Sequence, residues 1–441
     1  MNNSRAVIIV KNPEALRVAA SSARISTQQG TALEIFDRSL GDERDLKLIN
    51  KVLSSGHKSV IEHQVFSVAF NNVSVLVEQF VIEARLASYT VKSRPYVDFA
   101  GAGFVVPEEL AEEQRALYAS TMRARFADYE KLLALGVPKE DARFVLPYCL
   151  RSNFFMTLNA RALIALVSAM LTGRGKGFAE IEALGAQLKA QFDALYPGVI
   201  DAELAHSPGY APMSLPDSIA EPRVGVGGAA LLSATPGAEA LLEAAMGFSG
   251  RFEPELGMYM TQRNLRRLLL DARPRELELL NYVFGIQRIS LACLTHFVRH
   301  RVDSPVVPPV AAALAGGSYV LPETVRAIPE AERLYRAAFE SQAVAAREAL
   351  ALGLAQANLG YFAVSGHQLD ILLGMNGREL MHFMKLRTCS RAQWEIQGVA
   401  GEMLALLQAE LPALFGMYGP SCRFGPCPEG RMSCGKPRER I

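Results

Sequence analysis

The feature that most constrains the fold of this chain is an internal repeat. Its 441 residues contain two blocks that match later blocks in the same order. Glu62 aligns with Glu278, a shift of 216 (from 62 to 278), and the ungapped alignment then places Phe66, Val73, Ser74, Arg85 and Ser88 on Tyr282, Ile289, Ser290, Arg301 and Ser304. Asn-Ala-Arg-Ala-Leu at 159–163 aligns with Asn-Gly-Arg-Glu-Leu at 376–380, a shift of 217 (from 159 to 376). Self-similarity at one period predicts two copies of one domain joined end to end.

The boundary between the copies is predicted from composition. Residues 216–228 are rich in Pro and Gly, which is typical of a linker or turn region. We therefore expect a first copy over residues 1–218, a second copy over 219–418, and a Cys-rich C-terminal tail over 419–441.

Each copy is predicted to be an α+β domain. Residues 60–70 combine β-branched and aromatic residues in partial alternation, as in a half-buried strand. Because the strands are few and hairpin-like, α+β is favoured over a doubly wound parallel sheet. Apolar residues recur at helical spacing over 76–88, 290–303, 335–354 and 377–411, the last of which stops where Pro412 would break a helix.

Composition excludes several classes of protein. Lys plus Arg is 46 against 45 for Asp plus Glu, so the global charge indicates neither a nucleic-acid nor a membrane partner. The apolar stretches fall well below the roughly 20 residues of a membrane span, and the N-terminus does not resemble a signal peptide. Six cysteines in so long a chain form no disulfide framework, and we expect a cytoplasmic protein.

Two blocks of the second copy carry the candidate chemistry. Arg-His-Arg at residues 299–301 suits phosphate or flavin binding, because arginine forks match phosphate oxygens. The alternative is a solvated helix C-terminus, where cations are favoured anyway. In the second block, residues 376–396, Arg378 and His382 are four apart and share a helix face. Interleaved apolar residues favour a polar stripe that faces a cleft.

These blocks resemble the flavin-dependent thymidylate synthases, whose hallmark reads Arg-His-Arg-x-x-Ser-x-Asn-Glu-x-Ser-x-Arg-Tyr. The family's upstream motif, Ser-Val-x-Glu-His-x-x-Phe, is present in the first copy at residues 59–66. The second copy holds Arg-His-Arg-x-x-Ser at 299–304. It also holds the downstream motif, Asn-x-Arg-x-Leu-x-His-Phe-x-x-Leu-Arg-x-x-x-x-Ala-Gln-x-Glu-Ile, at 376–396. Together the two copies cover nearly the entire chain.

The resemblance implies reductive methylation of dUMP, or a related uridine nucleotide, at C5. Bound FAD is reduced by NADPH, methylenetetrahydrofolate supplies the carbon, and the protein positions the reactants. By position, Arg387 would face the pyrimidine and His63 would lie by the flavin ring, as the two catalytic residues. The implied FAD contacts are Arg299, His300, Arg301, Asn376, Arg378 and His382. The implied nucleotide contacts are Ser93, Tyr96, Arg143 and Arg387. Pro95 stands where the hallmark has its last arginine, and Arg94, one position early, can substitute for it in a loop but not in a strand, which would turn it to the other face.

The two copies depart from the motifs in complementary ways. After Ser304 the second copy has apolar residues and Pro where the hallmark is polar, and it carries Leu279 and Gly360 in place of His63 and Arg143. The first copy has Glu-Ala-Arg at residues 83–85 in place of Arg-His-Arg. One hypothesis is a composite site in each chain, with a homodimer forming a pseudo-tetramer. The alternatives are a flavoprotein that methylates another pyrimidine, and a diverged flavin- or nucleotide-binding paralogue that serves as a binding or scaffolding module.

The C-terminal tail is a candidate metal site. Cys422, Cys427 and Cys434 lie close together in sequence, and clustered thiols in a cytoplasmic chain suggest Zn²⁺ or an iron–sulfur cluster. A structural zinc site takes four ligands, so Cys389 or a second chain would supply the fourth. A disordered tail and a redox pair are the alternatives. Cys149 is expected to be an ordinary core residue, as is Cys293.

Overall fold

A computed structural model describes residues 3–92, 101–206 and 213–441, and it divides into two compact units. Unit 1 comprises Met1–Glu221, Pro309–Ala315 and Pro322–Ser365; unit 2 comprises Pro222–Pro308, Gly316–Leu321 and Gly366–Ile441. The chain therefore enters unit 2 near the expected junction and then returns to unit 1 within the second copy. The repeat boundaries at 218 and 418 stay predictions, because compact units and sequence repeats are different divisions of the chain.

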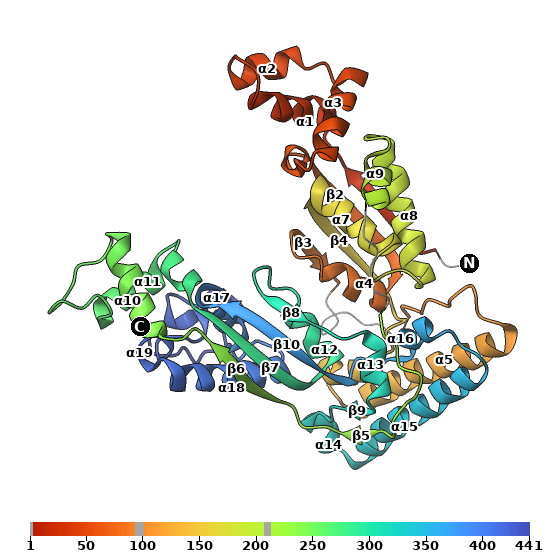
Figure 1. Ribbon diagram of the computed structural model, residues 1–441. Coiled ribbons are helices and arrows are strands. Elements are labelled where there is room, and N and C mark those ends of the chain that lie inside the picture. The colour runs from red at the N-terminus through yellow and green to blue at the C-terminus, as the bar shows by residue number, and fades with distance from the viewer. Residues whose placement is uncertain (1–2, 93–100, 207–212) are drawn as a thin grey trace. The chain divides into compact units, whose positions relative to one another are not determined.

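Unit 1 combines a four-stranded sheet with helices from both copies (Figure 1). Its strands are β1 (Arg5–Val10), β2 (Val65–Ser74), β3 (Ala87–Val91) and β4 (Arg151–Asn159). Its helices from the first copy are α1 (Ala15–Ile25), α2 (Ala32–Arg38), α3 (Glu43–Ser54), α4 (Val75–Ile82), α5 (Glu112–Ala134), α6 (Lys139–Ala142), α7 (Ala160–Leu171), α8 (Ala179–Asp193) and α9 (Val199–His206), with 3₁₀ turns η1 (Lys58–Ile61) and η2 (Arg143–Val145). The second copy adds α13 (Val310–Ala315), α14 (Glu323–Arg326), α15 (Pro329–Ala351), η4 (Gln356–Asn358) and α16 (Leu359–Phe362).

Unit 2 holds a second four-stranded sheet and the C-terminal tail. Its strands are β5 (Arg223–Val224), β6 (Gly228–Ala234), β7 (Asn281–Ser290), β8 (Ser304–Val306), β9 (Ser318–Tyr319) and β10 (Gln368–Asn376). Its helices are α10 (Ala238–Ser249), α11 (Gln262–Leu270), α12 (Leu291–Phe297), α17 (Gly377–Arg387), α18 (Trp394–Glu410) and α19 (Pro412–Phe415), with 3₁₀ turns η3 (Arg275–Leu279), η5 (Ser421–Arg423) and η6 (Gly430–Met432).

The two sheets have the same topology. The first runs β1-β2-β4-β3 and the second β6-β7-β10-β8, and every pairing in both is antiparallel. Helix α8 packs on β1, and α18 packs on β6 in the same way. The two helices are equivalent, because α8 is the second helix after β4 and α18 is the second helix after β10. The structure thus confirms an α+β fold that is present twice in one chain.

The local backbone geometry also repeats. Asn72 has φ 54° and Arg288, 216 positions later, has φ 51°. Left-handed backbone is uncommon outside glycine, so the shared value marks the same bulge in both copies. Each bulge is followed by a serine that caps the next helix: Ser74 Oγ accepts from Val77 N at 3.1 Å, and Ser290 Oγ accepts from Cys293 N at 3.0 Å.

An ion pair recurs between equivalent residues, at shifts of 216 (62 to 278) and 217 (161 to 378). Arg161 Nη1 lies 2.6 Å from Glu62 Oε1, and Arg378 Nη1 lies 2.5 Å from Glu278 Oε1. The two glutamates are the residues that define the sequence repeat. Because these pairs are partly exposed, each contributes little to stability, and their value is as a marker of common descent.

Equivalent segments of the two copies pair with each other inside unit 1. Tyr148 N donates to Ala363 O at 2.7 Å, and Ser365 N donates to Leu146 O at 3.0 Å. Each bond becomes the other when the copies are exchanged at a shift of 217 (148 to 365, 146 to 363). A reciprocal contact of this kind is what a two-fold axis generates. The 23-residue helices α5 and α15 also occupy equivalent positions and pack against each other (Figure 1).

The ends of the helices and strands differ from those expected from the sequence. The strand expected from residue 60 begins at Val65, because η1 precedes it. The helix expected over 76–88 ends at Ile82 and gives way to β3, and the one expected to reach 303 ends at Phe297. The pattern over 377–411 is two helices, while 335–354 lies almost wholly in α15. No helix in the described ranges is both long and apolar enough to cross a bilayer.

A buried charge in the α5–α15 contact gives a test of the pairing. Arg125 Nη2 lies 2.8 Å from Asp128 Oδ2, and Arg125 Nη1 donates to Ser341 Oγ at 2.9 Å and to Ala338 O. Removing one member of a buried pair leaves the other uncompensated, so Arg125→Met should lower the free energy of unfolding by about 3–5 kcal/mol. Urea denaturation measures this. The exposed Arg123 on the same helix is the control, and equal effects of Arg123→Met and Arg125→Met would contradict the pairing.

Candidate active site

A cavity of about 800 Å³ opens in unit 2 between the end of α12 and the start of α17. Four cations line it, Arg299, Arg301, Arg378 and Lys385, with the carboxylates Asp271, Glu278 and Glu379 and the imidazoles of His300 and His382. Asn376 completes its polar lining. All six residues that the resemblance assigns to FAD therefore meet in one cavity, although they come from blocks far apart in sequence.

The start of α17 is fixed by its cap and by close packing. Asn376 Oδ1 accepts from Glu379 N at 2.8 Å, which satisfies one of the free amides of the first turn. A Cβ on Gly377 would lie 2.9 Å from Leu277 O, so this helix start approaches η3 too closely for a larger residue. Glu278 of η3 then pairs with Arg378 and holds its guanidinium at the cavity wall.

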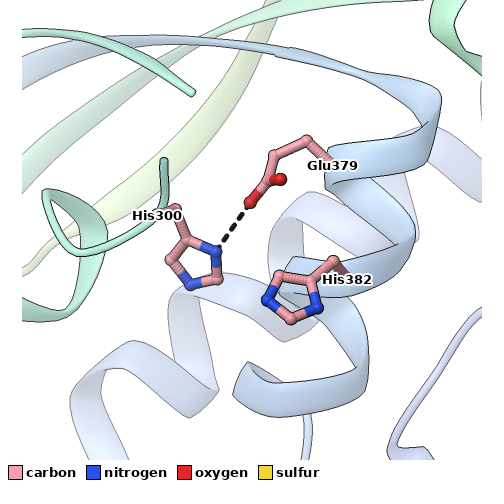
Figure 2. A group of neighbouring side chains, drawn as sticks. All are labelled: His300, Glu379 and His382. Atoms are coloured by element: carbon pink, nitrogen blue, oxygen red, sulfur yellow. Dashed lines mark hydrogen bonds and ion pairs between the residues drawn. The ribbon is translucent and has the colours of Figure 1, made fainter. Parts of the chain in front are cut away.

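His300 is held at both ring nitrogens. Its Nδ1 lies 2.8 Å from Glu379 Oε1 (Figure 2), and its Nε2 lies 3.2 Å from Arg387 Nε. Since an arginine Nε always donates, Nε2 must accept and Nδ1 must carry the proton that it donates to the carboxylate. The ring is buried, and this burial lowers its pKa despite the opposing effect of Glu379. His300 is therefore a neutral imidazole of one defined tautomer.

Arg387 joins this network from the last turn of α17. Its Nη2 donates to His296 O at 3.1 Å in addition to the bond from Nε to His300. Burial, reinforced by the positive charge of Arg299, lowers the pKa of Arg387 to about 10. The guanidinium is still charged at neutral pH.

His300, Glu379 and His382 form the one group within the described ranges that brings three possible metal donors within 4.8 Å (Figure 2). Both nitrogens of His300 are already engaged, and the proton on Nδ1 is donated to Glu379. The rings of His300 and His382 meet edge to face with centroids 5.6 Å apart. The arrangement is that of an oriented hydrogen-bond network beside a cavity, since a metal would need a free ring nitrogen.

The described site residues of the first copy, His63 and Arg143, lie in unit 1. His63 is exposed just before β2, and Arg143 is buried in η2, where its Nε donates to Glu140 O at 3.0 Å. Ser93, Arg94 and Tyr96 lie outside the described residues. The nucleotide contacts assigned to the first copy therefore stay predictions.

At the position of Arg299 the first copy has a glutamate that forms an ion pair. Glu83, at the position of Arg299, forms an ion pair with Arg174 and accepts from Gln79 Nε2 at 2.9 Å. Arg174 also stacks over the Phe80 ring, 4.5 Å from its centroid. Ala84 stands where His300 stands in the second copy and offers no imidazole.

The tail cysteines line a separate cavity of unit 2. Cys422, Cys427 and Cys434 form no group of three donors within 4.8 Å, so the predicted metal site stays a prediction. The hydroxyl of Ser390 and the amide of Lys436 donate to the Cys434 thiol and lower its pKa. Cys149 and Cys293 are buried, as expected for core residues.

Glu379 and Lys385 line the cavity but are not among the site residues predicted from the sequence. Glu379 stands at a variable position of the motif, although it fixes the tautomer of His300. Lys385 lines both the 800 Å³ cavity and the cavity of the tail, and burial lowers its pKa. Its spacing gave a signal, since it follows His382 by three residues and so continues the same helix face.

The lowered pKa of His300 predicts how stability depends on pH. Between its folded pKa and its unfolded pKa of about 6.5, the unfolded chain binds a proton that the folded chain does not, so stability falls as pH falls through this window. His300→Gln removes this titration while leaving Glu379, Arg387 and His382 in place. Urea denaturation at pH 7.5 and 5.5 should show a smaller loss for the variant, by up to about 1.4 kcal/mol per pH unit. Equal losses would contradict a buried neutral imidazole.

Comparison with known proteins gives one consistent family. The family model described as "Thymidylate synthase complementing protein" matches twice, over residues 7–198 and 230–413. A flavin-dependent thymidylate synthase of Geobacter sulfurreducens is 37% identical over 166 residues, which are 37% of this chain and 72% of that protein. One of Nitratidesulfovibrio vulgaris is 31% identical over 240 residues, 49% of this chain and 95% of that protein.

Solved structures give weaker likenesses. Thymidylate synthase X of Helicobacter pylori, crystallised with FAD and dUMP, is 20% identical with a TM-score of 0.37, covering 46% of this chain and all of that one (100%). A UMP/dUMP methylase of Streptomyces cacaoi, bound with 5-Br dUMP, is 24% identical with a TM-score of 0.39, covering 46% of this chain and 96% of that one.

Proposed function

This chain belongs to the thymidylate synthase complementing protein family, as its motifs predicted, and from that premise we propose that it is a flavin-dependent thymidylate synthase-like methyltransferase. The proposed reaction transfers a one-carbon unit from methylenetetrahydrofolate to C5 of dUMP, or a related uridine nucleotide, with NADPH as reductant. The observation that carries the proposal is the meeting of Arg299, His300, Arg301, Asn376, Arg378 and His382 in one polar cavity.

The residues present fit FAD. A volume of about 800 Å³ lies within the roughly 300–1,000 Å³ of typical cofactor pockets. Arg299 and Arg301 are exposed, so their forked guanidinium groups can reach phosphate oxygens in a bidentate geometry. Bound FAD would supply the relay of electrons from NADPH to the transferred carbon.

The chain's own side chains would bind the flavin and the nucleotide and orient them. Neutral His300 donates to Glu379 and accepts from Arg387, so it fixes the buried arginine without adding charge. A guanidinium that faces the pyrimidine stabilises negative charge developing on that ring, which is the role we propose for Arg387. We propose that His63 and Arg143 act on flavin and nucleotide as their motifs imply, and that the protein is a homodimer.

The alternative function is a binding paralogue without turnover, and one observation favours it. Ser304–Val306 forms strand β8, which pairs with β10 through Gly374, Leu373 and Leu372. A hallmark segment that supplies nucleotide contacts in the family is here an apolar sheet edge. Activity thus depends on nucleotide contacts from outside this segment.

The effect of matched substitutions on FAD affinity tests which copy holds the flavin site. Arg301→Ala should weaken FAD binding about 10- to 100-fold, because a charge-assisted hydrogen bond contributes about 1.5–3 kcal/mol. Arg85→Ala, the same change at the equivalent position of the first copy, should leave affinity unchanged. Titration followed by flavin absorbance and fluorescence measures both. Equal losses would refute a flavin site in the second copy, and a wild-type protein that binds no FAD would refute the proposed function.

A turnover assay distinguishes the proposed methyltransferase from a binding paralogue without activity. With FAD and methylenetetrahydrofolate present, dUMP should stimulate NADPH oxidation and yield dTMP. Arg387→Gln should lower kcat at least about 100-fold, as expected when a group that stabilises developing charge is lost. Arg333→Gln, the same change at an exposed arginine of α15, should not. Flavin reduction with no response to dUMP and no dTMP would contradict the proposed substrate.

A further inference from the structure

We propose that Cys389, Cys422, Cys427 and Cys434 bind one Zn²⁺, which ties the C-terminal tail to the turn after helix α17. All four cysteines are lining residues of a single cavity of about 230 Å³ in unit 2. They are four of the six cysteines of the chain, and the other two, Cys149 and Cys293, are buried elsewhere in the core. This site does not depend on the flavin proposal.

The donor set suits a closed structural zinc site. Four thiolates around Zn²⁺ at about 2.3 Å, in tetrahedral geometry, form one of the common structural sites. Cys389 comes from the turn between α17 and α18, and the other three come from the tail within thirteen residues (422 to 434). The structure supplies from the same chain the fourth ligand that the tail alone lacks.

Hydrogen-bond donors already surround two of the sulfurs. Arg438 N donates to Cys422 Sγ at 3.3 Å. The amide of Lys436 and the hydroxyl of Ser390 donate to the Cys434 thiol. Gly435, with φ 72°, permits the sharp turn that brings the Lys436 amide back toward that sulfur. Outer-shell donors of this kind orient metal-binding side chains.

The charge around the cavity matches a thiolate cluster. Zn²⁺ with four thiolates carries a net charge of −2, and Lys385, Arg387 and Arg391 line the same cavity. Glu429 is the one carboxylate among its lining residues. Nearby cations offset the cost of gathering four thiolates.

The thiols can close around an ion through movement of turns. Cys422 lies in the 3₁₀ turn η5, while Cys389, Cys427 and Cys434 lie outside the helices and strands of unit 2. The tail already contacts the α17 region, because Ser421 Oγ donates to Lys385 O at 3.1 Å and Arg391 Nε donates to Met432 O at 2.6 Å. No three of the four sulfurs lie within 4.8 Å of one another, so binding an ion would draw these turns together.

The consequence would be a fixed C-terminal end of α17. Cys389 follows Arg387 by two residues, and Lys385 lines both cavities. The zinc would act as a positioning device for the helix that carries Arg378 and His382.

Metal content tests the assignment directly. Full-length protein produced with added zinc, and purified with a reductant but no chelator, should retain about one Zn²⁺ per chain by elemental analysis. Cys389→Ser and Cys434→Ser should each lose most of it. Ser433→Ala, which removes a hydroxyl from the same cavity, should keep it. Zinc retained in full by Cys389→Ser, or absent from wild type even after reconstitution with Zn²⁺ alone, would overturn the proposal.

Two further measurements keep the proposal testable if the cysteine variants do not fold. Co²⁺ substitution of wild type should give the sulfur-to-cobalt charge-transfer absorption and the intense visible bands of a tetrahedral thiolate site. Stripping the metal with a chelator should lower Tm reversibly, with recovery on adding Zn²⁺. Iron with inorganic sulfide in place of zinc, or a disulfide between tail cysteines in the mass of the freshly purified chain, would also overturn it.

Discussion

The reciprocal main-chain pairing of Leu146–Tyr148 with Ala363–Ser365 is the contact on which the architecture depends. These segments are equivalent positions of the two copies, so the pairing needs both copies to be complete. It explains why residues 322–365 of the second copy lie in unit 1, where α15 packs on its own counterpart α5. A gene duplication that fused two subunits of a symmetric pair would leave this arrangement, with an interface between subunits converted into the core of one unit.

The two copies share their backbone features but differ in the residues of the candidate site. The bulges at Asn72 and Arg288 and the glutamates that pair with Arg161 and Arg378 serve the backbone, and both copies retain them. The network around His300 serves the cavity, and only the second copy has it among the residues described. In the first copy, the ion pair between Glu83 and Arg174 occupies the equivalent place. Once two sites were fused in one chain, changes in one of them left the fold intact.

The repeat and the motifs could be predicted because residue identities and their spacing along the chain are enough to recognise both. Residue spacing does not determine where a helix ends. Apolar residues continue from α4 toward β3, and the break between α17 and α18 depends on Gln393, whose side chain accepts from Ile396 N at 3.1 Å. Glu379 was missed because its bond to His300 joins positions 79 residues apart. The sequence also could not predict that part of the second copy lies in unit 1, since a helical pattern does not identify the helix that it packs against.

We propose that each chain has one flavin site, in its second copy. Native mass spectrometry of the FAD-saturated protein can test this, because it counts the cofactors on each intact assembly together with its chains. The expected result is one FAD per chain at saturation, whatever the number of chains in the assembly. Two FAD molecules per chain would mean that the first copy, despite Glu83 and Ala84, still forms a site, and would contradict the division of labour proposed for the two copies.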